Sequence, residues 1–205
     1  MLVYFDIDST VFTTHLFKKT RIDPQLEELL GVPLEEIQQT ENEYFGNLEK
    51  STDFQYQAFA SFLATTYAHV GGTAPEHVIQ GLFEKPELYR DMLFSDVMPL
   101  VRELSDRGIQ MGVYSEGYTD FQTNKITFTG LSDYLEPSEI VIARRKQAPE
   151  VLAKLSQPSI VIDDKVEYLE TLPIEVGGVW INRKTEENHP IFATIHSLEE
   201  VLPLV

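Results

Sequence analysis

The sequence contains no cysteine. This absence excludes disulfide scaffolds, cysteine-ligated zinc, iron–sulfur clusters and cysteine nucleophiles. Basic residues are also scarce, since 16 lysines and arginines stand against 33 aspartates and glutamates and give a net charge of −17. A field of this sign repels nucleic acid and anionic membrane surfaces, so we expect neither as a partner. If the substrate is an anion, a cation must offset the field locally.

The N-terminal segment lacks the basic stretch and the long apolar run of a signal peptide, and its first acid is already Asp6. We therefore expect a cytoplasmic protein. The longest stretch without a charged residue, residues 54–75, is long enough to span a bilayer. It carries glutamine, serine and threonine residues and His69, and this polar content favours a buried amphipathic helix over a membrane span.

The chain has 205 residues, of which 42% are hydrophobic and 24% charged, as in one globular domain or a core domain with a modest insertion. Short apolar runs rich in valine and isoleucine recur along it. Such runs are typical of strands that are covered on both faces, and hence of a parallel sheet. We predict strands at residues 2–7, 109–114, 140–143, 159–162 and 176–181.

Helical patterns separate the later strands. Residues 99–107 place apolar side chains on one face and are followed by Gly108, a good helix stop. Further helices are predicted at residues 119–130, 149–155 and 166–172. The alternation of strands and helices from about residue 96 onward predicts a doubly wound α/β layer.

Residues 13–95 break this alternation, because they contain helical patterns and no convincing strand. Asp23 and Pro24 predict the start of a helix, as its N-cap and first residue, and Gly31 predicts its end. Further helical segments are predicted at residues 34–50, 53–70, 75–83 and 86–92. We therefore expect an all-helical insertion after the first strand.

The clearest chemical feature is the run YFDIDSTV at residues 4–11, which ends the first predicted strand. In an extended chain Asp6 and Asp8 point the same way, and like charges this close repel each other unless they share a cation or a proton. One carboxylate can act as a nucleophile or ligand while the other donates a proton. An acidic turn without a catalytic role is the alternative interpretation.

A second predicted strand ends in paired acids, Asp163 and Asp164, within the run VIDDK. Mg²⁺ prefers carboxylate and water oxygens, and the acidic ends of two strands in one parallel sheet can converge on one ion. We therefore expect a magnesium site here. A helix N-cap is the alternative interpretation, and it explains one aspartate better than two.

Two further strand ends carry groups suited to an anion. Ser115 offers a hydroxyl and neighbouring backbone amides, and Lys146 lies in the basic run RRKQAP. A turn and a solvated charge run are the ordinary interpretations of these segments. All four strand ends nevertheless belong to one edge, and ligands of open α/β sheets bind outside the carboxyl ends of the strands.

This order of motifs resembles the haloacid dehalogenase-like (HAD) hydrolase superfamily, phosphatase type with a helical cap. The matching residues are, from the first motif to the fourth, Asp6 with Asp8, then Ser115, then Lys146, then Asp163 with Asp164. The resemblance covers residues 1–12 and 96–205 as a Rossmann-like catalytic core. Residues 13–95 match the cap in position and type.

The resemblance implies a magnesium-dependent phosphatase that hydrolyses a small phosphomonoester through an aspartyl-phosphate. Asp6 would be the nucleophile, and Asp8 would protonate the leaving oxygen and then activate water. Ser115 and Lys146 would bind the phosphoryl oxygens, and Lys146 would also keep Asp6 anionic. This division suits phosphoryl transfer, which depends on positioning and charge neutralisation.

The resemblance also implies how the metal and the insertion take part. Asp6, the backbone carbonyl of Asp8 and Asp164 would hold Mg²⁺, with Asp163 as a further ligand or as a partner that supports one. The insertion would close over the site, exclude water and read the leaving group.

This sequence departs from the family pattern at some positions. Ser9 stands where the first motif usually has glycine, Glu116 adds a negative charge beside the expected phosphate site, and Lys125 is an alternative third-motif lysine. A phosphoryl mutase, a dehalogenase and a weakly active phospho-ligand-binding regulatory domain are alternative functions. Dehalogenases of the superfamily normally lack the second aspartate and need no magnesium, so Asp8 and Asp164 argue against that reaction. The substrate and the oligomeric state stay open.

A small basic group, Lys18, Lys19 and Arg21, lies between the predicted core and the insertion, close to His15. We interpret the basic group as a solvated face and His15 as a structural residue. Steering of the substrate and a place at the cap entrance are the alternatives.

Overall fold

The computed structural model describes residues 1–68 and 74–205. Six parallel strands in this part of the chain form one sheet in the order β3-β2-β1-β4-β5-β6. They are β1 (Leu2–Phe5), β2 (Gln110–Glu116), β3 (Ile140–Ala143), β4 (Ser159–Asp163), β5 (Val176–Ile181) and β6 (Ala193–Ile195). The order reverses between β1 and β4, where ligands bind in doubly wound sheets. The predicted fold class is therefore confirmed.

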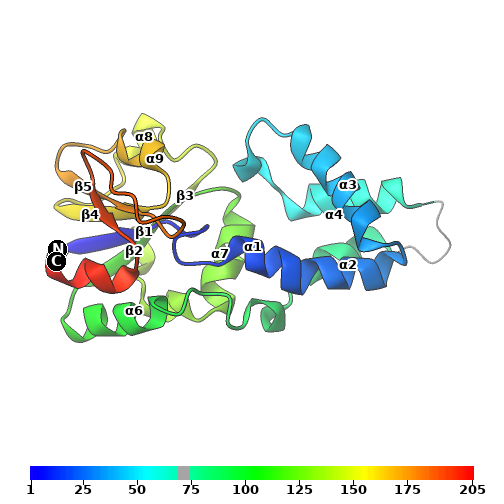
Figure 1. The fold of residues 1–205 in the computed structure, drawn as a ribbon, viewed down its shortest axis with the longest axis horizontal. Helices are drawn as coiled ribbons and strands as arrows, with labels where there is room; N and C mark the ends of the chain where they lie inside the picture. Colours follow the sequence, from blue (N-terminus) through cyan, green and yellow to red (C-terminus); the bar gives the residue numbers. More distant parts are fainter. Residues whose placement is uncertain (69–73) are drawn as a thin grey trace.

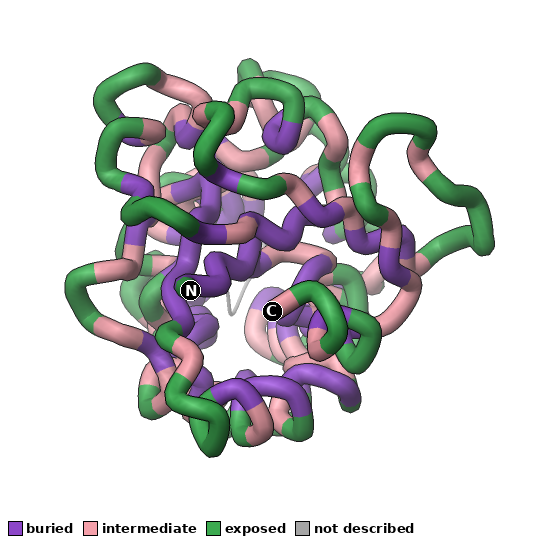
Figure 2. Tube along the Cα trace, turned by 90° about the vertical axis from the view of Figure 1, so that its left-hand side faces the viewer, coloured by how far each residue is buried: buried purple, intermediate pink, exposed green. Residues whose placement is uncertain are grey.

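The sheet is covered on both faces because successive residues of each strand point to opposite sides. Val3 and Phe5 of β1 pack with apolar side chains of α6 (Val97–Asp106), α7 (Thr119–Phe128) and the 3₁₀-helix η6 (Leu198–Leu204). Leu2 and Tyr4 join a second core with α8 (Pro149–Leu152) and α9 (Val166–Leu169). Figure 1 shows these layers, and Figure 2 shows buried residues along the central strands.

The predicted strands and core helices are present, with small differences at their ends. Helix α8 is shorter than predicted, because Lys154 and Leu155 donate to the carbonyls of Val151 and Leu152, a tighter i→i+3 pattern. Strand β6 lies outside the predicted set, since its three residues are too few to show a pattern.

Between β1 and α6 the described residues form helices and no strand. These are α1 (Thr14–Phe17), the π-helix η1 (Lys18–Ile22), α2 (Asp23–Leu30), α3 (Leu34–Gly46), the 3₁₀-helix η2 (Ser51–Asp53), α4 (Tyr56–Thr66), α5 (Glu76–Leu82) and the 3₁₀-helix η3 (Pro86–Tyr89). In Figure 1 they lie beside the sheet, at the end of the molecule remote from both termini. The division into a core and a cap at residues 12 and 96 stays a prediction.

Some predictions for the insertion need correction. Asp23 is not an N-cap, because α1, η1 and α2 follow one another without a break and the carboxylate of Asp23 accepts a hydrogen bond from Lys18 instead, at 2.9 Å. Gly31 does end α2, in the left-handed conformation that glycine favours. The helix predicted at residues 53–70 begins only at Tyr56, and its last predicted residues, with His69, lie outside the described part. No described helix is both long and apolar enough to cross a membrane.

Candidate active site

Asp6 follows β1 directly, and its backbone N–H donates to the carbonyl of Ile162 on neighbouring β4, at 2.9 Å. This bond places its side chain at the switch point of the sheet. One carboxylate oxygen, Oδ1, accepts hydrogen bonds from Ser115 Oγ at 3.1 Å and from Lys146 Nζ at 2.8 Å. The structure thus brings together three of the predicted residues from three different strand ends.

Lys146 is fully buried, and its Nζ also binds Asp163 Oδ2 and lies 4.1 Å from the centre of the Tyr168 ring. Burial alone would lower the pKa of Lys146, but the carboxylates of Asp6 and Asp163 outweigh it and raise this pKa above its ordinary value. Lys146 is therefore a fixed cation inside a strongly acidic protein. It is the local positive charge that an anionic substrate requires.

Asp6, Asp163 and Asp164 form a cluster that could hold a metal ion. Each offers one carboxylate oxygen, and these three oxygens lie within 4.8 Å of one another. Burial and the nearby charge of Asp6 raise the pKa of Asp163 to about 7 and that of Asp164 to about 6. Mutual repulsion of this kind is relieved by a hard divalent cation with oxygen ligands, so the residues present fit Mg²⁺.

The side chain of Asp8 lies apart from that cluster, contrary to the expectation that Asp6 and Asp8 point the same way. Asp8 Oδ1 lies 2.6 Å from Lys125 Nζ and also accepts from Thr14 Oγ1, and Oδ2 accepts from Gln122 Nε2 at 2.7 Å. Burial raises the pKa of Asp8, but Lys125 and these donors outweigh it, and the net direction is downward. A metal contact through the backbone carbonyl of Asp8 stays a prediction.

Local backbone conformation explains the separation of the two carboxylates. Strand β1 ends at Phe5, before either aspartate, so the alternation expected of an extended chain does not apply. Ser9 has a φ of 63°, the left-handed region in which glycine is free of steric cost. The turn therefore needs the conformation that glycine supplies in the family pattern, and serine adopts it here at some strain.

Glu116 points neither outward nor at Asp6. It is buried, and its carboxylate accepts from Thr52 Oγ1 at 2.9 Å and from the backbone N–H of Lys146 at 3.0 Å, with Lys50 Nζ at 3.5 Å. Burial raises the pKa of Glu116, but these partners outweigh it and lower the pKa below its ordinary value. The charge that the sequence places beside the phosphate site thus serves to hold the segment around η2 against the sheet.

The two arginines before Lys146 also bind the segment around η2. Arg144 and Arg145 each lie 2.7 Å from the Asp53 carboxylate in η2, and Arg145 also reaches Glu49, at 3.1 Å. Arg144 is exposed, as in a solvated charge run, but both arginines pair with a carboxylate of the insertion. Together with Glu116 they dock the segment 49–53 of the insertion onto the carboxyl edge of the sheet.

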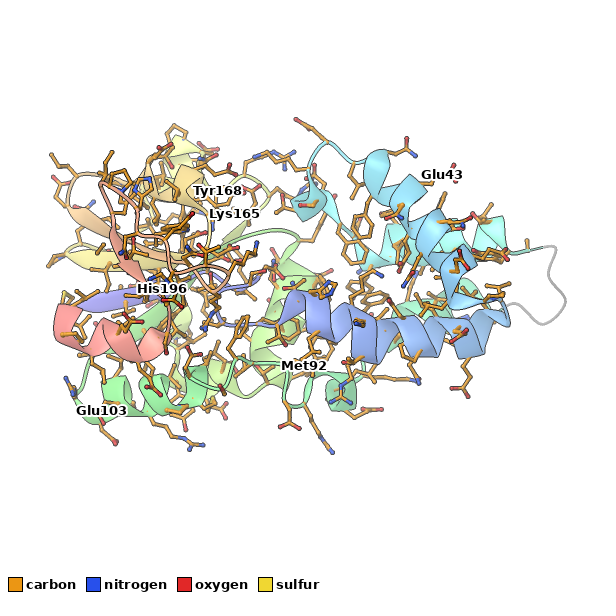
Figure 3. The ribbon with its side chains drawn as sticks, in the orientation of Figure 1. Glu43, Met92, Glu103, Lys165, Tyr168 and His196 are labelled. Atoms are coloured by element: carbon orange, nitrogen blue, oxygen red, sulfur yellow. The ribbon has the colours of Figure 1, made fainter. Side chains whose placement is uncertain are left out.

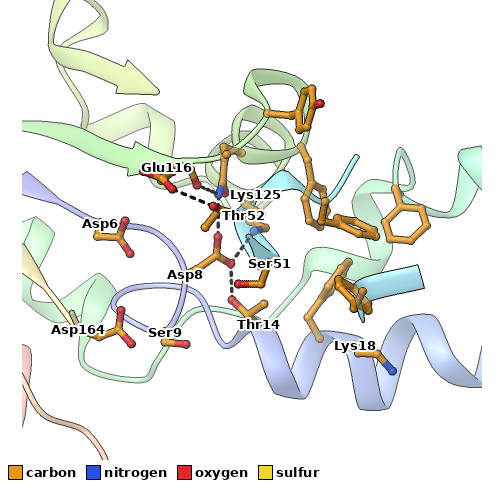
Figure 4. Close-up of a pocket in the computed structure, with 18 of the residues that line it drawn as sticks. Asp6, Asp8, Ser9, Thr14, Lys18, Ser51, Thr52, Glu116, Lys125 and Asp164 are labelled. Carbon is orange, nitrogen blue, oxygen red and sulfur yellow. Dashed lines mark hydrogen bonds and ion pairs between the residues drawn. The ribbon is translucent and has the colours of Figure 1, made fainter. Parts of the chain in front are cut away.

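A cavity of about 310 Å³ opens between this edge and the insertion. Asp6, Asp8, Asp164 and Lys125 line one part of it, and Lys18 lies away from Asp6 and Asp164 (Figure 4). Glu41 also belongs to the lining. Lys18 is half-buried and lines the cavity, whereas Lys19 is exposed, as the interpretation of a solvated face predicts. His15 is exposed as well.

Sequence reasoning missed Gln122 and Thr14 as partners of Asp8, and it considered Lys125 only as a partner of Asp6. Lys125 is buried in α7 with its Nζ 4.2 Å from the centre of the Phe121 ring. A lysine within a helical run predicts a solvated side chain, so no pattern marked it as buried. Lys146 contacts Asp6 and Lys125 contacts Asp8, so the assignment of Lys146 to the third motif stays the preferred prediction.

The chain matches no protein-family model. Its fold matches the HAD-hydrolase YfnB of Bacillus subtilis, in a structure bound to magnesium, with a TM-score of 0.66 and 16% identity over 99% of this chain and 97% of that one. It matches a HAD phosphatase of Thermococcus onnurineus with a TM-score of 0.62 and 19% identity, over 99% and 96% of the chains. An L-2-haloacid dehalogenase of Xanthobacter autotrophicus matches with a TM-score of 0.60 and 14% identity, over 99% and 97%.

These matches show that the chain has the fold of the HAD-like hydrolases, which confirms the resemblance at the level of the fold. A phosphatase and a dehalogenase share that fold. The reaction must therefore be argued from the residues of this site.

Proposed function

We propose that the chain is a magnesium-dependent phosphatase that hydrolyses a small phosphomonoester through an aspartyl-phosphate. The observation that carries the proposal is the group of Asp6, Asp163 and Asp164 around one point, with Lys146 paired with both Asp6 and Asp163. A phosphoryl group adds negative charge to carboxylates that already repel each other. Mg²⁺, bound by Asp6 and Asp164 with Asp163 as ligand or supporting partner, would supply the positive charge that holds the phosphoryl oxygens and stabilises the transition state.

The chain's own residues can perform two successive displacements. The carboxylate of Asp6 attacks phosphorus, the bond from phosphorus to the ester oxygen breaks, and Asp8 gives its proton to that oxygen. Asp8 then takes a proton from water, whose oxygen attacks the phosphoryl group, so that phosphate leaves and Asp6 is regenerated. Ser115 and Lys146 would bind phosphoryl oxygens, since both donors already converge on Asp6 Oδ1.

A dehalogenase is the second candidate, because a dehalogenase has the same fold. Displacement of a halide from carbon by Asp6 places no phosphoryl charge in the site and has no use for Asp164 or for a proton donor such as Asp8. The acidic cluster and the separately held Asp8 therefore favour phosphoryl transfer.

The test is turnover of p-nitrophenyl phosphate with Mg²⁺, with EDTA, and by the isosteric variant Asp6→Asn. We expect turnover only with the metal, and a loss of about a thousandfold or more in the variant, because an amide is a poor nucleophile. Acid-quenched wild type should carry one phosphoryl group, detected as added mass, and the variant none. Turnover retained by Asp6→Asn, or chloride release from 2-chloropropionate without metal, would contradict the proposal.

A further inference from the structure

The cavity beside the proposed phosphate site has a largely apolar lining. Beside polar residues such as Ser51, Thr52 and Tyr118, it is lined by six phenylalanines and one isoleucine: Phe17, Ile22, Phe45, Phe54, Phe59, Phe83 and Phe121. In Figure 4 aromatic rings gather on the side of the cavity remote from Asp6 and Asp164. All of these side chains except Phe121 come from the insertion.

The rings form one continuous surface with Phe54 at its centre. The ring centre of Phe54 lies 5.4 Å from that of Phe59, 5.5 Å from those of Phe45 and Phe121, and 5.8 Å from that of Phe83. Rings at these distances offer faces and edges to an apolar or aromatic group, and they offer no hydrogen bonds. This aromatic surface therefore fits an apolar part of a leaving group better than a hydroxylated one.

The far end of the cavity is acidic. Lys18 Nζ lies 2.6 Å from Glu41 Oε2 and 2.9 Å from Asp23 Oδ1, so one ammonium group faces two carboxylates. Glu41 is only 3% exposed, and burial raises its pKa although Lys18 opposes the effect. A second cation placed against Glu41 would neutralise the remaining negative charge of this trio.

We propose that the substrate is the phosphomonoester of an apolar alcohol whose body packs against the Phe54 surface and whose other end carries an amino group bound by Glu41. The inference rests on the proposed phosphatase activity. Sugar phosphates fit the aromatic surface poorly, because each hydroxyl buried against it without a partner would cost about tenfold or more in transition-state binding.

The test compares three esters of primary alcohols, so that the leaving oxygen is chemically alike in all of them. They are 2-phenylethyl phosphate, its 4-aminomethyl derivative and glucose 6-phosphate. We expect kcat/KM to be at least about tenfold higher for 2-phenylethyl phosphate than for the sugar ester, and about tenfold higher again for the amino ester.

Two variants in α3 test whether Glu41 causes the preference for the ester that carries an amino group. Glu41→Gln should lower the ratio of kcat/KM between the amino ester and 2-phenylethyl phosphate by about tenfold, because the amide keeps the shape and loses the charge. Glu43→Gln is the matched control, since Glu43 is an exposed glutamate of the same helix, on the outside of the insertion (Figure 3), and should leave the ratio unchanged. Thermal unfolding verifies that both variants fold.

Each outcome decides one part of the inference. Equal or faster turnover of glucose 6-phosphate would overturn the apolar body, and an unchanged ratio in Glu41→Gln would overturn the amino group. If wild type fails even on p-nitrophenyl phosphate, the proposed activity has failed, and calorimetry of the same esters then tests the cavity by itself. Tighter binding of the amino ester by about tenfold would support the inference, and equal or no binding of the two phenylethyl esters would overturn it.

Discussion

Magnesium should stabilise this protein strongly at pH 8 and hardly at all at pH 5. Asp163 and Asp164 have folded pKa values of about 7 and about 6 against an ordinary value of 3.8, so folding favours their protonated forms. The resulting stability is complete below about pH 4 and is lost as the pH rises through 6 and 7. Each pKa unit corresponds to about 1.4 kcal/mol, so ionising Asp163 alone costs the metal-free fold about 4 kcal/mol at pH 8.

Thermal unfolding measured with Mg²⁺ and with EDTA between pH 5 and pH 8.5 is the assay. A chain of this size loses about 2–4 °C of Tm per kcal/mol, so the metal-free Tm should fall by roughly 10 °C over this range. Mg²⁺ should restore most of the loss at pH 8, because it binds the ionised carboxylates.

The variant Asp164→Asn isolates the site from the five histidines that titrate in the same range. It removes one repelling charge and one ligand, so its metal-free Tm at pH 8 should lie above that of wild type, and its response to Mg²⁺ should be largely lost. A metal-free Tm below that of wild type, or an equal response to Mg²⁺ in both proteins, would refute the reasoning.

Two further predictions concern single contacts. Lys125→Met leaves the half-buried Asp8 without its cation, so the pKa of Asp8 rises. Because Asp8 is the acid of the first displacement, the basic limb of the kcat/KM pH profile should move to higher pH; an unmoved limb would show that Asp8 does not control it. Gly112→Ala adds a methyl carbon 2.5 Å from the carbonyl oxygen of Glu139 and 2.8 Å from the Tyr4 ring. Urea unfolding should show a loss of about 1–3 kcal/mol or more, and wild-type stability would mean that β2 can shift away from Glu139.

The core of the fold could be predicted because parallel strands that are buried on both faces have short, continuous apolar sequences. Residues 140–143 and 176–181 form strands with the predicted bounds. The insertion was less predictable. Helix α1, the π-helix η1 and α2 form one continuous helical run. Asp23 and Pro24, in the middle of that run, instead predict the beginning of a new helix. The carboxylate of Asp23 does not cap a helix here, because it accepts a hydrogen bond from Lys18, five residues earlier in the same helical run.

The site residues at the strand ends could be predicted in the same way, and those of the insertion could not. Asp6, Ser115, Lys146 and Asp163 lie where parallel strands end, and the topology alone brings those ends together. The cavity wall comes from several helices of the insertion, and its residues contact one another across long separations in the chain. Phe54 and Phe121 pack 5.5 Å apart, although Phe54 lies in the extended segment between η2 and α4 and Phe121 lies in α7, far along the chain. Only the packing of the insertion on the sheet turns them into one surface.

The spacing of Asp6 and Asp8 in the first motif does not predict which side chains each carboxylate contacts. Asp6 and Asp8 were expected to share one cation or one proton, but each has its own lysine, Lys146 for Asp6 and Lys125 for Asp8. Separate partners allow the two carboxylates to differ in role. Because the pKa of Asp8 is lowered, Asp8 begins as a carboxylate, the form that activates water in the second displacement. To act as an acid in the first displacement it must gain a proton as the phosphoryl group binds beside it, since a second negative charge raises its pKa. The proposed mechanism therefore requires substrate binding to be coupled to proton uptake at Asp8, with Lys125 setting the pH at which that uptake occurs.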